Sequence, residues 1–152
     1  MGNPLFHVVL VEPEIPQNTG NIGRLTLGLD VRLHLVHPLG FSLSEKAVRR
    51  AGLDYWKHVD VQEHDSLEDF LTWSKGKSLF LFSTKAKPSY RKAKYTEDCV
   101  LVFGPESRGL SADIRNQFPC VTIPMSGPIR SLNLSNAVAV ASYEAYHQIH
   151  GD

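Results

Sequence analysis

Residues 6–24 of the chain read FHVVLVEPEIPQNTGNIGR. The first six residues of this stretch are almost all apolar and rich in valine, a pattern typical of a strand that is buried on both faces of a sheet. The rest begins as a loop that two prolines stiffen, and we expect a helix to start near Thr19 or Gly20. Arg24 should then lie about one turn inside this helix.

Apolar runs of the same kind recur along the chain and predict six strands. They cover residues 6–11, 31–36, 59–61, 79–82, 99–103 and 120–123. Ser42 opens a capping box whose helix should end near Gly52, and Ser66 opens another whose helix should end near Gly76. Ser111 should cap a short helix over residues 112–117. Strands that alternate with helices predict an α/β fold with a mainly parallel six-stranded sheet and helices on both faces.

Length and composition indicate one domain over residues 1–152, because 42% hydrophobic residues are enough for a single core. Sixteen basic and sixteen acidic residues balance, so any contact with a nucleic acid should be local. We expect no signal peptide, lipid anchor or membrane span, and therefore a cytoplasmic protein with no membrane partner. Cys99 and Cys120 lack metal or redox spacing and should be reduced core residues.

Ligands of open α/β sheets bind at the carboxyl ends of the strands, so the loops that follow strands are the places to look for chemistry. The first such loop, residues 12–24, leads into a helix N-terminus that favours an anion such as a phosphate. Asn18 and Arg24 could both face this helix mouth and hold a phosphodiester and the hydroxyl beside it. A capped helix with Arg24 on its solvated face explains the loop equally well. The pattern is not a dinucleotide fingerprint, because Gly20 and Gly23 are its only glycines.

Two further loops contain unusual residues. Gly104 follows a strand directly and could let a flat ligand approach the backbone, with the Glu106 carboxylate just beyond it, although a plain turn is the alternative. Residues 131–136, SLNLSN, offer several possible helix caps where one is needed. Alternative caps account for Asn133 or Ser135 but leave Arg130 and Ser131 unexplained, which favours a ligand site. The helix from Asn133 to about residue 149 is apolar almost all round in its first half, so it should be buried in a core or an oligomer interface.

The run at residues 85–94 has five basic residues and no acidic one, with Tyr90 inside it and Tyr95 next to it. It could bind an RNA backbone and stack bases, and a solvated basic loop is the alternative. His147 and His150 have no apparent third ligand, so we expect no metal.

Residues 13–24, residues 103–110 (FGPESRGL) and residues 123–138 resemble, in order and spacing, the three motifs of the SpoU branch of the SPOUT methyltransferases. Within that branch, the chain length and the EPEIP segment resemble the short tRNA (cytidine/uridine wobble-position) 2′-O-methyltransferases. The resemblance implies a deep trefoil knot near the C-terminus, which general folding rules would have excluded. It also implies a homodimer that uses S-adenosyl-L-methionine to methylate a ribose hydroxyl of tRNA, with the wobble nucleotide of the anticodon as the target.

Site residues follow from the same resemblance. The first motif supplies Asn18 and Arg24 to the part of the active site that binds the substrate. The third motif supplies Asn133, and Glu106 matches the acid of the second motif. The cofactor would be held by residues matching Phe82, Gly104, Ile123, Met125 and Ser131.

The proton of the ribose hydroxyl needs an acceptor. Arg24 stays protonated in a protein, so it should polarise the hydroxyl, and an RNA phosphate or Glu106 should take the proton. Alternative functions are ribose methylation of another RNA such as rRNA, or a non-catalytic RNA-binding or ribosome-assembly factor with the same fold. The intact Asn18, Arg24 and Asn133 argue against the second of these.

Overall fold

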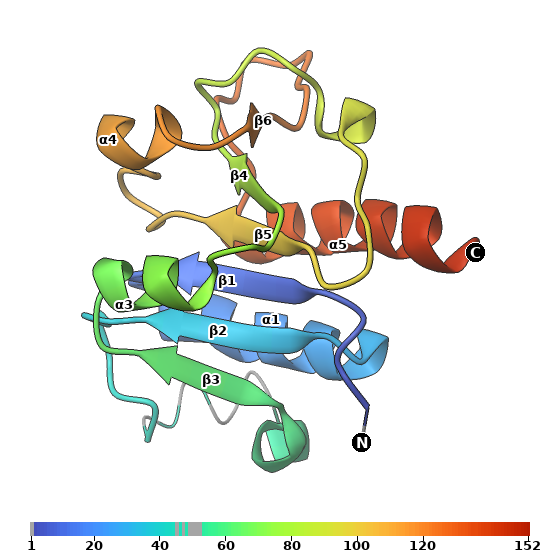
Figure 1. Ribbon diagram of the computed structural model, residues 1–152. Coiled ribbons are helices and arrows are strands. Elements are labelled where there is room, and N and C mark those ends of the chain that lie inside the picture. The colour runs from blue at the N-terminus through green and yellow to red at the C-terminus, as the bar shows by residue number, and fades with distance from the viewer. Residues whose placement is uncertain (1, 45, 47, 49–52) are drawn as a thin grey trace.

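The computed structural model describes residues 2–44, 46, 48 and 53–152. Within these ranges the chain forms one six-stranded sheet with the strand order β3-β2-β1-β5-β4-β6, and every strand pairing is parallel (Figure 1). The elements follow one another as β1 (His7–Val11), α1 (Pro16–Leu29), β2 (Arg32–Val36), η1 (Leu53–His58), β3 (Val61–His64), α3 (Leu67–Trp73), β4 (Leu79–Phe82), η2 (Tyr90–Lys92), β5 (Val100–Phe103), α4 (Ala112–Arg115), β6 (Cys120–Val121) and α5 (Leu134–His150).

Helices cover both faces of the sheet, as the sequence predicted. Along β1, Val8 and Leu10 belong to the hydrophobic cluster under α1 and α5, which lie together behind the sheet in Figure 1. Val9 and Val11 point to the other face and belong to the cluster that includes Phe70 of α3. Side chains alternate between the faces of a strand, so an apolar run such as that of β1 must be covered on both sides.

The structure moves several of the predicted element bounds; for example, α4 ends at Arg115 and β6 ends at Val121. The strand predicted at residues 59–61 is β3, which begins only at Val61, because the Val59 N–H closes the preceding turn on the carbonyl of Trp56 (3.1 Å). The first helix begins at Pro16 and not near Thr19, since a proline has no N–H to lose at the first position of a helix. Arg24 is therefore more than two turns inside α1, and the prediction of one turn was wrong.

The predicted helix caps differ in outcome. The Ser66 hydroxyl accepts from the Asp69 N–H at 3.1 Å and caps α3, as predicted. Ser111 occupies the cap position of α4, but its side chain makes no capping hydrogen bond to the described residues. The helix predicted to follow Ser42 includes residues 45, 47 and 49–52, which lie outside the described residues.

α5 buries one side within the chain through Val138, Ala141 and Ala145. On the other side of the helix, Val140 is 39% exposed to solvent and Tyr143 is 55% exposed. A single chain thus covers only part of the apolar surface of this helix. Among the helices in the described ranges, none has the length and hydropathy to cross a bilayer.

Both cysteines lie in the described part of the chain and are free. Cys99 is buried in the core, where burial raises the pKa of its thiol to about 11. Cys120 is partly buried, and burial raises its pKa as well. These environments agree with the prediction of reduced structural cysteines.

Three buried histidines, His7, His34 and His64, form a hydrogen-bonded chain across β1, β2 and β3, which the sequence analysis did not predict. We call these residues the histidine chain. His7 Nε2 donates to the Asp98 carboxylate at 2.7 Å, since a carboxylate can only accept. The Nδ1 of His7 is then an acceptor for His34 Nε2, and His34 Nδ1 for His64 Nε2, each at 2.9 Å. The Trp73 ring packs against all three imidazoles.

Candidate active site

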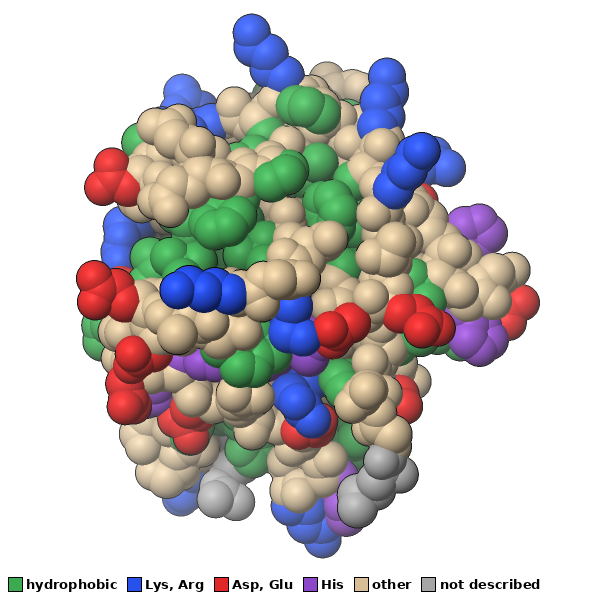
Figure 2. Space-filling model, in the orientation of Figure 1, with side chains coloured by type: hydrophobic (Ala, Val, Ile, Leu, Met, Phe, Trp, Pro, Cys, Tyr) green, Lys and Arg blue, Asp and Glu red, His purple; other side chains and the backbone are tan. Residues whose placement is uncertain are grey.

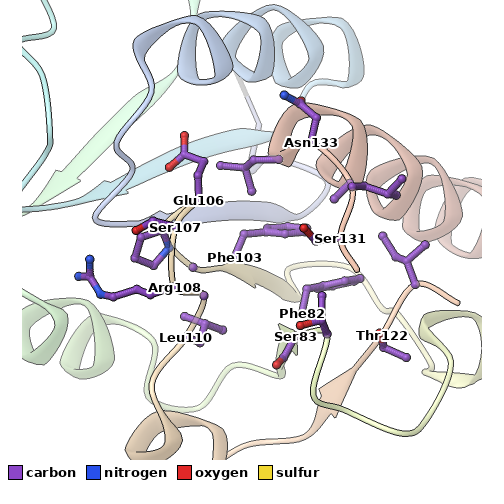
Figure 3. A pocket seen from close by; sticks show the side chains of 18 of the residues that line it. Phe82, Ser83, Phe103, Glu106, Ser107, Arg108, Leu110, Thr122, Ser131 and Asn133 are labelled. Atoms are coloured by element: carbon purple, nitrogen blue, oxygen red, sulfur yellow. The ribbon is translucent and has the colours of Figure 1, made fainter. Parts of the chain in front are cut away.

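A pocket of about 490 Å³ opens at the carboxyl ends of β4 and β5, where the sequence analysis placed the chemistry. Its volume is in the range of small-molecule sites. Phe82 and Phe103 end these two strands and are partners in the strand register. Their rings stack with centroids 4.6 Å apart and lie in the middle of the pocket in Figure 3. Adjacent parallel strands thereby provide a flat apolar surface.

All five residues proposed for the cofactor line this pocket: Phe82, Gly104, Ile123, Met125 and Ser131. They come from the end of β4 and from the loops that follow β5 and β6. Ser83, Thr84 and Thr122, whose side chains carry hydroxyls, line the same pocket. The pocket therefore combines apolar walls with a few polar groups, as sites for small organic ligands do.

Gly104 lines the pocket and is also required by the fold of its own loop. A Cβ on Gly104 would lie 2.4 Å from backbone atoms of both Gly109 and Leu110, so a side chain would strike the loop itself before any ligand. The loop closes further through the Gly109 N–H, which donates to the Pro105 carbonyl at 2.8 Å. Gly109 also has a φ of +68°, in the left-handed region that favours glycine. The two glycines allow residues 104–110 to fold back tightly along the pocket.

Glu106 bonds this loop to the start of α1. Its carboxylate accepts from the backbone N–H groups of Glu14 (2.8 Å) and Ile15 (3.0 Å) and from Nδ2 of Asn18 (3.1 Å). Ile15 is the N-cap of α1 and has no side-chain cap bond among the described residues. A carboxylate from another loop thus supplies an acceptor where a helix N-terminus favours negative charge.

Asn133 links the third loop to the same group. Its Nδ2 donates to Oδ1 of Asn18 at 3.1 Å, while its own Oδ1 accepts from the N–H groups of Ser135 and Asn136 and so caps α5. The predicted cap at Asn133 is confirmed, and the residue also reaches the first loop. Glu106, Asn18 and Asn133 form one hydrogen-bonded network that joins all three loops, and all three residues line the pocket. Figure 3 shows Glu106 and Asn133 at its upper edge.

Arg24 is apart from this network. It is exposed on α1, its guanidinium lies 5.0 Å from the centroid of the Tyr55 ring, and it is not among the described residues that line the pocket. Asn18 is 4% exposed. Six residues along a helix separate the two side chains by about 9 Å along the axis and about 120° around it. The expectation that Asn18 and Arg24 share one helix mouth was therefore wrong.

The basic run contributes charge at the rim of the pocket. Lys85 lines the pocket, and Lys87, Lys92 and Lys94 are exposed. In Figure 2, Lys and Arg side chains project from the upper edge of the molecule, where the segment between β4 and β5 lies in Figure 1. Tyr95 is not available to stack on a base, because it is 4% exposed and its hydroxyl donates to the Tyr90 carbonyl at 2.6 Å.

Sequence reasoning missed Glu14 and Arg108, which join the first and second loops through their side chains. The EPEIP segment was noted, but nothing local indicates that its second glutamate meets residues more than ninety positions away. The described residues contain no group of three His, Cys, Asp or Glu side chains that could hold a metal ion.

Comparison with known proteins gives consistent matches. Residues 5–143 match the SpoU rRNA Methylase family. A tRNA (cytidine(34)-2'-O)-methyltransferase from Methylovorus glucosotrophus (strain SIP3-4) is 47% identical over 95% of this chain and 96% of its own length. The protein of the same name from Escherichia coli (strain K12) is 44% identical over 95% and 94%. A solved structure described as giving insights into the 2-OH methylation of C/U34 on tRNA has a TM-score of 0.95 and 50% identity over 99% of this chain and 100% of that one.

Proposed function

The chain belongs to the SpoU rRNA Methylase family, and we propose that it transfers a methyl group from S-adenosyl-L-methionine to the 2′-hydroxyl of nucleotide 34 of tRNA, the wobble position of the anticodon. The family description includes rRNA, but the relatives with 44–47% identity are named for cytidine 34 of tRNA and match over nearly their whole length. This full-length similarity supports tRNA over rRNA as the substrate. We place the protein in the cytoplasm and include the trefoil knot near the C-terminus in the same proposal.

The pocket fits the cofactor. A nucleoside carrying an amino-acid chain needs a flat apolar surface and a few hydrogen-bonding groups, which Phe82, Phe103 and the surrounding hydroxyls offer. Phe82, Gly104, Ile123, Met125 and Ser131 would hold it. When bound, it supplies a methyl group on a sulfonium, which is a good leaving group.

The network at the edge of the pocket would orient the ribose. Asn18 and Asn133 are bonded to each other and to Glu106 or the cap of α5, so their amides have fixed positions. A preorganised polar group of this kind can align a hydroxyl without rearranging. The Glu106 carboxylate already accepts three hydrogen bonds. We therefore assign it a positioning role and propose an RNA phosphate as the proton acceptor.

Arg24 is proposed to polarise the hydroxyl, because its guanidinium stays protonated and can stabilise developing negative charge. Since it does not line the pocket of its own chain, this role requires a homodimer in which α1 of one protomer faces the pocket of the other. The exposed Val140 and Tyr143 of α5 support a partner, because an apolar helix face needs cover.

The observation that carries the proposal is the Glu106–Asn18–Asn133 network, which brings the three motifs together at one pocket. Calorimetry with S-adenosylhomocysteine, NAD and ATP should show binding of the first alone. Purified protein should then move labelled methyl from S-adenosylmethionine to a tRNA transcript, and a transcript with 2′-deoxycytidine at position 34 should accept none. Equal labelling of both transcripts, or no labelling of either, would refute the assignment.

A further inference from the structure

We propose that Glu14 is a positioning residue for the pocket: its carboxylate holds the second loop, residues 104–110, in the shape in which that loop forms a pocket wall. The inference rests on the proposed function, because the effect of Glu14 on the reaction would pass through the cofactor site. Glu14 itself is not among the described residues that line the pocket, whereas Ser107 and Arg108 are.

Both oxygens of the Glu14 carboxylate contact the same residue. Oε1 accepts from the Ser107 backbone N–H at 2.8 Å, and Oε2 accepts from the Ser107 hydroxyl at 2.9 Å. The Arg108 guanidinium lies 3.5 Å from Oε2. The hydrogen bonds from Ser107 lower the pKa of Glu14, and the bond from the backbone N–H has a larger effect than the bond from the hydroxyl. Glu14 is therefore ionised at neutral pH. Charge-assisted hydrogen bonds are stronger than neutral ones.

A second glutamate makes the reciprocal contact. The Glu106 carboxylate accepts from the backbone N–H groups of Glu14 and Ile15. Each loop thus presents a carboxylate to backbone N–H groups of the other. Neither loop can shift along the other without breaking bonds in both directions. Such crossed contacts hold two segments together more firmly than a single pair.

The backbone of Glu14 is itself anchored to the sheet. The Pro13 carbonyl accepts from the Gly40 N–H at 2.9 Å, and a Cβ on Gly40 would lie 3.0 Å from the Glu14 Cα, so the two segments are closely packed. Glu12, at the end of β1, has a left-handed φ of 48°, and its N–H donates to the Val36 carbonyl at 2.9 Å. The ends of β1 and β2 therefore present Glu14 from a fixed base.

The second loop needs such a contact because it has little packing of its own. Ser107, Arg108 and Gly109 are exposed, and the buried Pro105 and Leu110 anchor the loop only on either side of them. Glu14 lies outside both hydrophobic clusters of the sheet. Removing its carboxylate should therefore alter the loop and the pocket wall with little effect on the core.

Glu12 provides a matched control. It is two residues away, also acidic, and accepts from the Arg108 guanidinium at 2.7 Å, but no contact to Ser107 involves it. An exposed ion pair of this kind contributes little. A loss seen in Glu14→Ala but not in Glu12→Ala would come from the bonds to Ser107 and not from the local charge.

The test compares wild type, Glu14→Ala, Glu14→Gln and Glu12→Ala. Glu14→Ala should bind S-adenosylhomocysteine about tenfold more weakly, and its KM for S-adenosylmethionine should rise by more than its kcat falls, with the melting temperature little changed. Glu14→Gln should recover most of the affinity, because its amide oxygen can still accept from the Ser107 N–H. Glu12→Ala should bind within about twofold of wild type. In the ligand-free protein, the amides of residues 107–109 should exchange faster only in Glu14→Ala.

Unchanged exchange in Glu14→Ala would overturn the inference, and so would faster exchange with unchanged affinity, because the pocket would then not depend on the loop. Equal losses in Glu12→Ala and Glu14→Ala would also overturn it. A wild-type protein that binds no S-adenosylhomocysteine would instead refute the proposed function. The two failures are distinguishable, because the exchange measurement needs no cofactor.

Discussion

Acidification should destabilise the protein through the histidine chain. Burial, with repulsion from the neighbouring His7 and His64, lowers the pKa of His34 to about 2, against 6.5 for an unperturbed histidine. Between these two values the unfolded chain binds a proton at His34 that the folded protein does not bind. The neutral, buried His34 therefore makes its full contribution to stability above pH 6.5. The free energy of unfolding falls as the pH drops below 6.5.

The magnitude follows from the same shift. One proton taken up only by the unfolded chain changes the free energy of unfolding by about 1.4 kcal/mol per pH unit, so His34 alone should cost about 1.4 kcal/mol at pH 5.5 relative to pH 7.5. Burial also lowers the pKa of His7 and His64, for which the sign is the same. The total loss should therefore exceed the contribution of His34.

Urea unfolding at pH 7.5, 6.5 and 5.5 would measure this loss. The fluorescence of Trp73, which packs against the histidine chain, would report the transition. His34→Gln removes one titrating group, so its free energy of unfolding should be lower at pH 7.5 but should fall less steeply towards pH 5.5. A wild-type stability that does not change between pH 7.5 and 5.5, or an equal slope in His34→Gln, would refute the reasoning.

Substitutions at three places test the site. Gly104→Val should lose S-adenosylhomocysteine binding in calorimetry, because its Cβ would lie 2.4 Å from the backbone of Gly109 and Leu110; binding as tight as wild type would contradict this account of the loop. Neutralising Lys85, Lys87, Arg91 and Lys92 should flatten the salt dependence of tRNA binding without changing cofactor affinity. If the salt dependence of tRNA binding stays the same, these residues belong to a solvated loop that does not bind RNA. Arg24→Ala and Arg24→Lys should keep the fold and cofactor binding but lose roughly two to four powers of ten in methyl transfer. Mixed dimers of Arg24→Ala and Gly104→Val protomers should regain activity if Arg24 serves the pocket of the partner, and no recovery would argue for action within one chain.

The location of the pocket could be predicted because it depends on local features. Apolar runs mark the strands, parallel strands end at the same edge of the sheet, and the loop residues that follow each strand meet there. Phe82 and Gly104 needed only this reasoning, together with the resemblance, to be placed in one pocket. Asn133 could be predicted as a helix cap for the same local reason.

The features that the sequence did not reveal depend on register and on long-range contacts. The histidine chain exists because the register pairs Val9 with His34 and Val36 with His64, which places three imidazoles diagonally across β1, β2 and β3. The prediction for Arg24 was wrong because α1 begins at Pro16, so Asn18 and Arg24 both lie within the helix and point from different faces of it.

The basic neighbours of Tyr95 made stacking on an RNA base one of two alternatives for it, the other being a solvated loop. In the fold its ring instead packs edge-on against Phe80 with centroids 4.9 Å apart, as part of the core under α1 and α5. A basic neighbourhood in the sequence does not reveal which side of the chain the core covers.

If this chain methylates the ribose of nucleotide 34 of tRNA, loss of its gene should remove that methyl group. Mass spectrometry of RNA from a strain that lacks the gene, compared with the same strain carrying it again, tests the claim most directly. We expect 2′-O-methylation at position 34 to be lost from one or a few tRNAs, to return with the intact gene and not to return with the Arg24→Ala gene. Intact methylation at position 34, with a ribose methylation missing from rRNA instead, would contradict it.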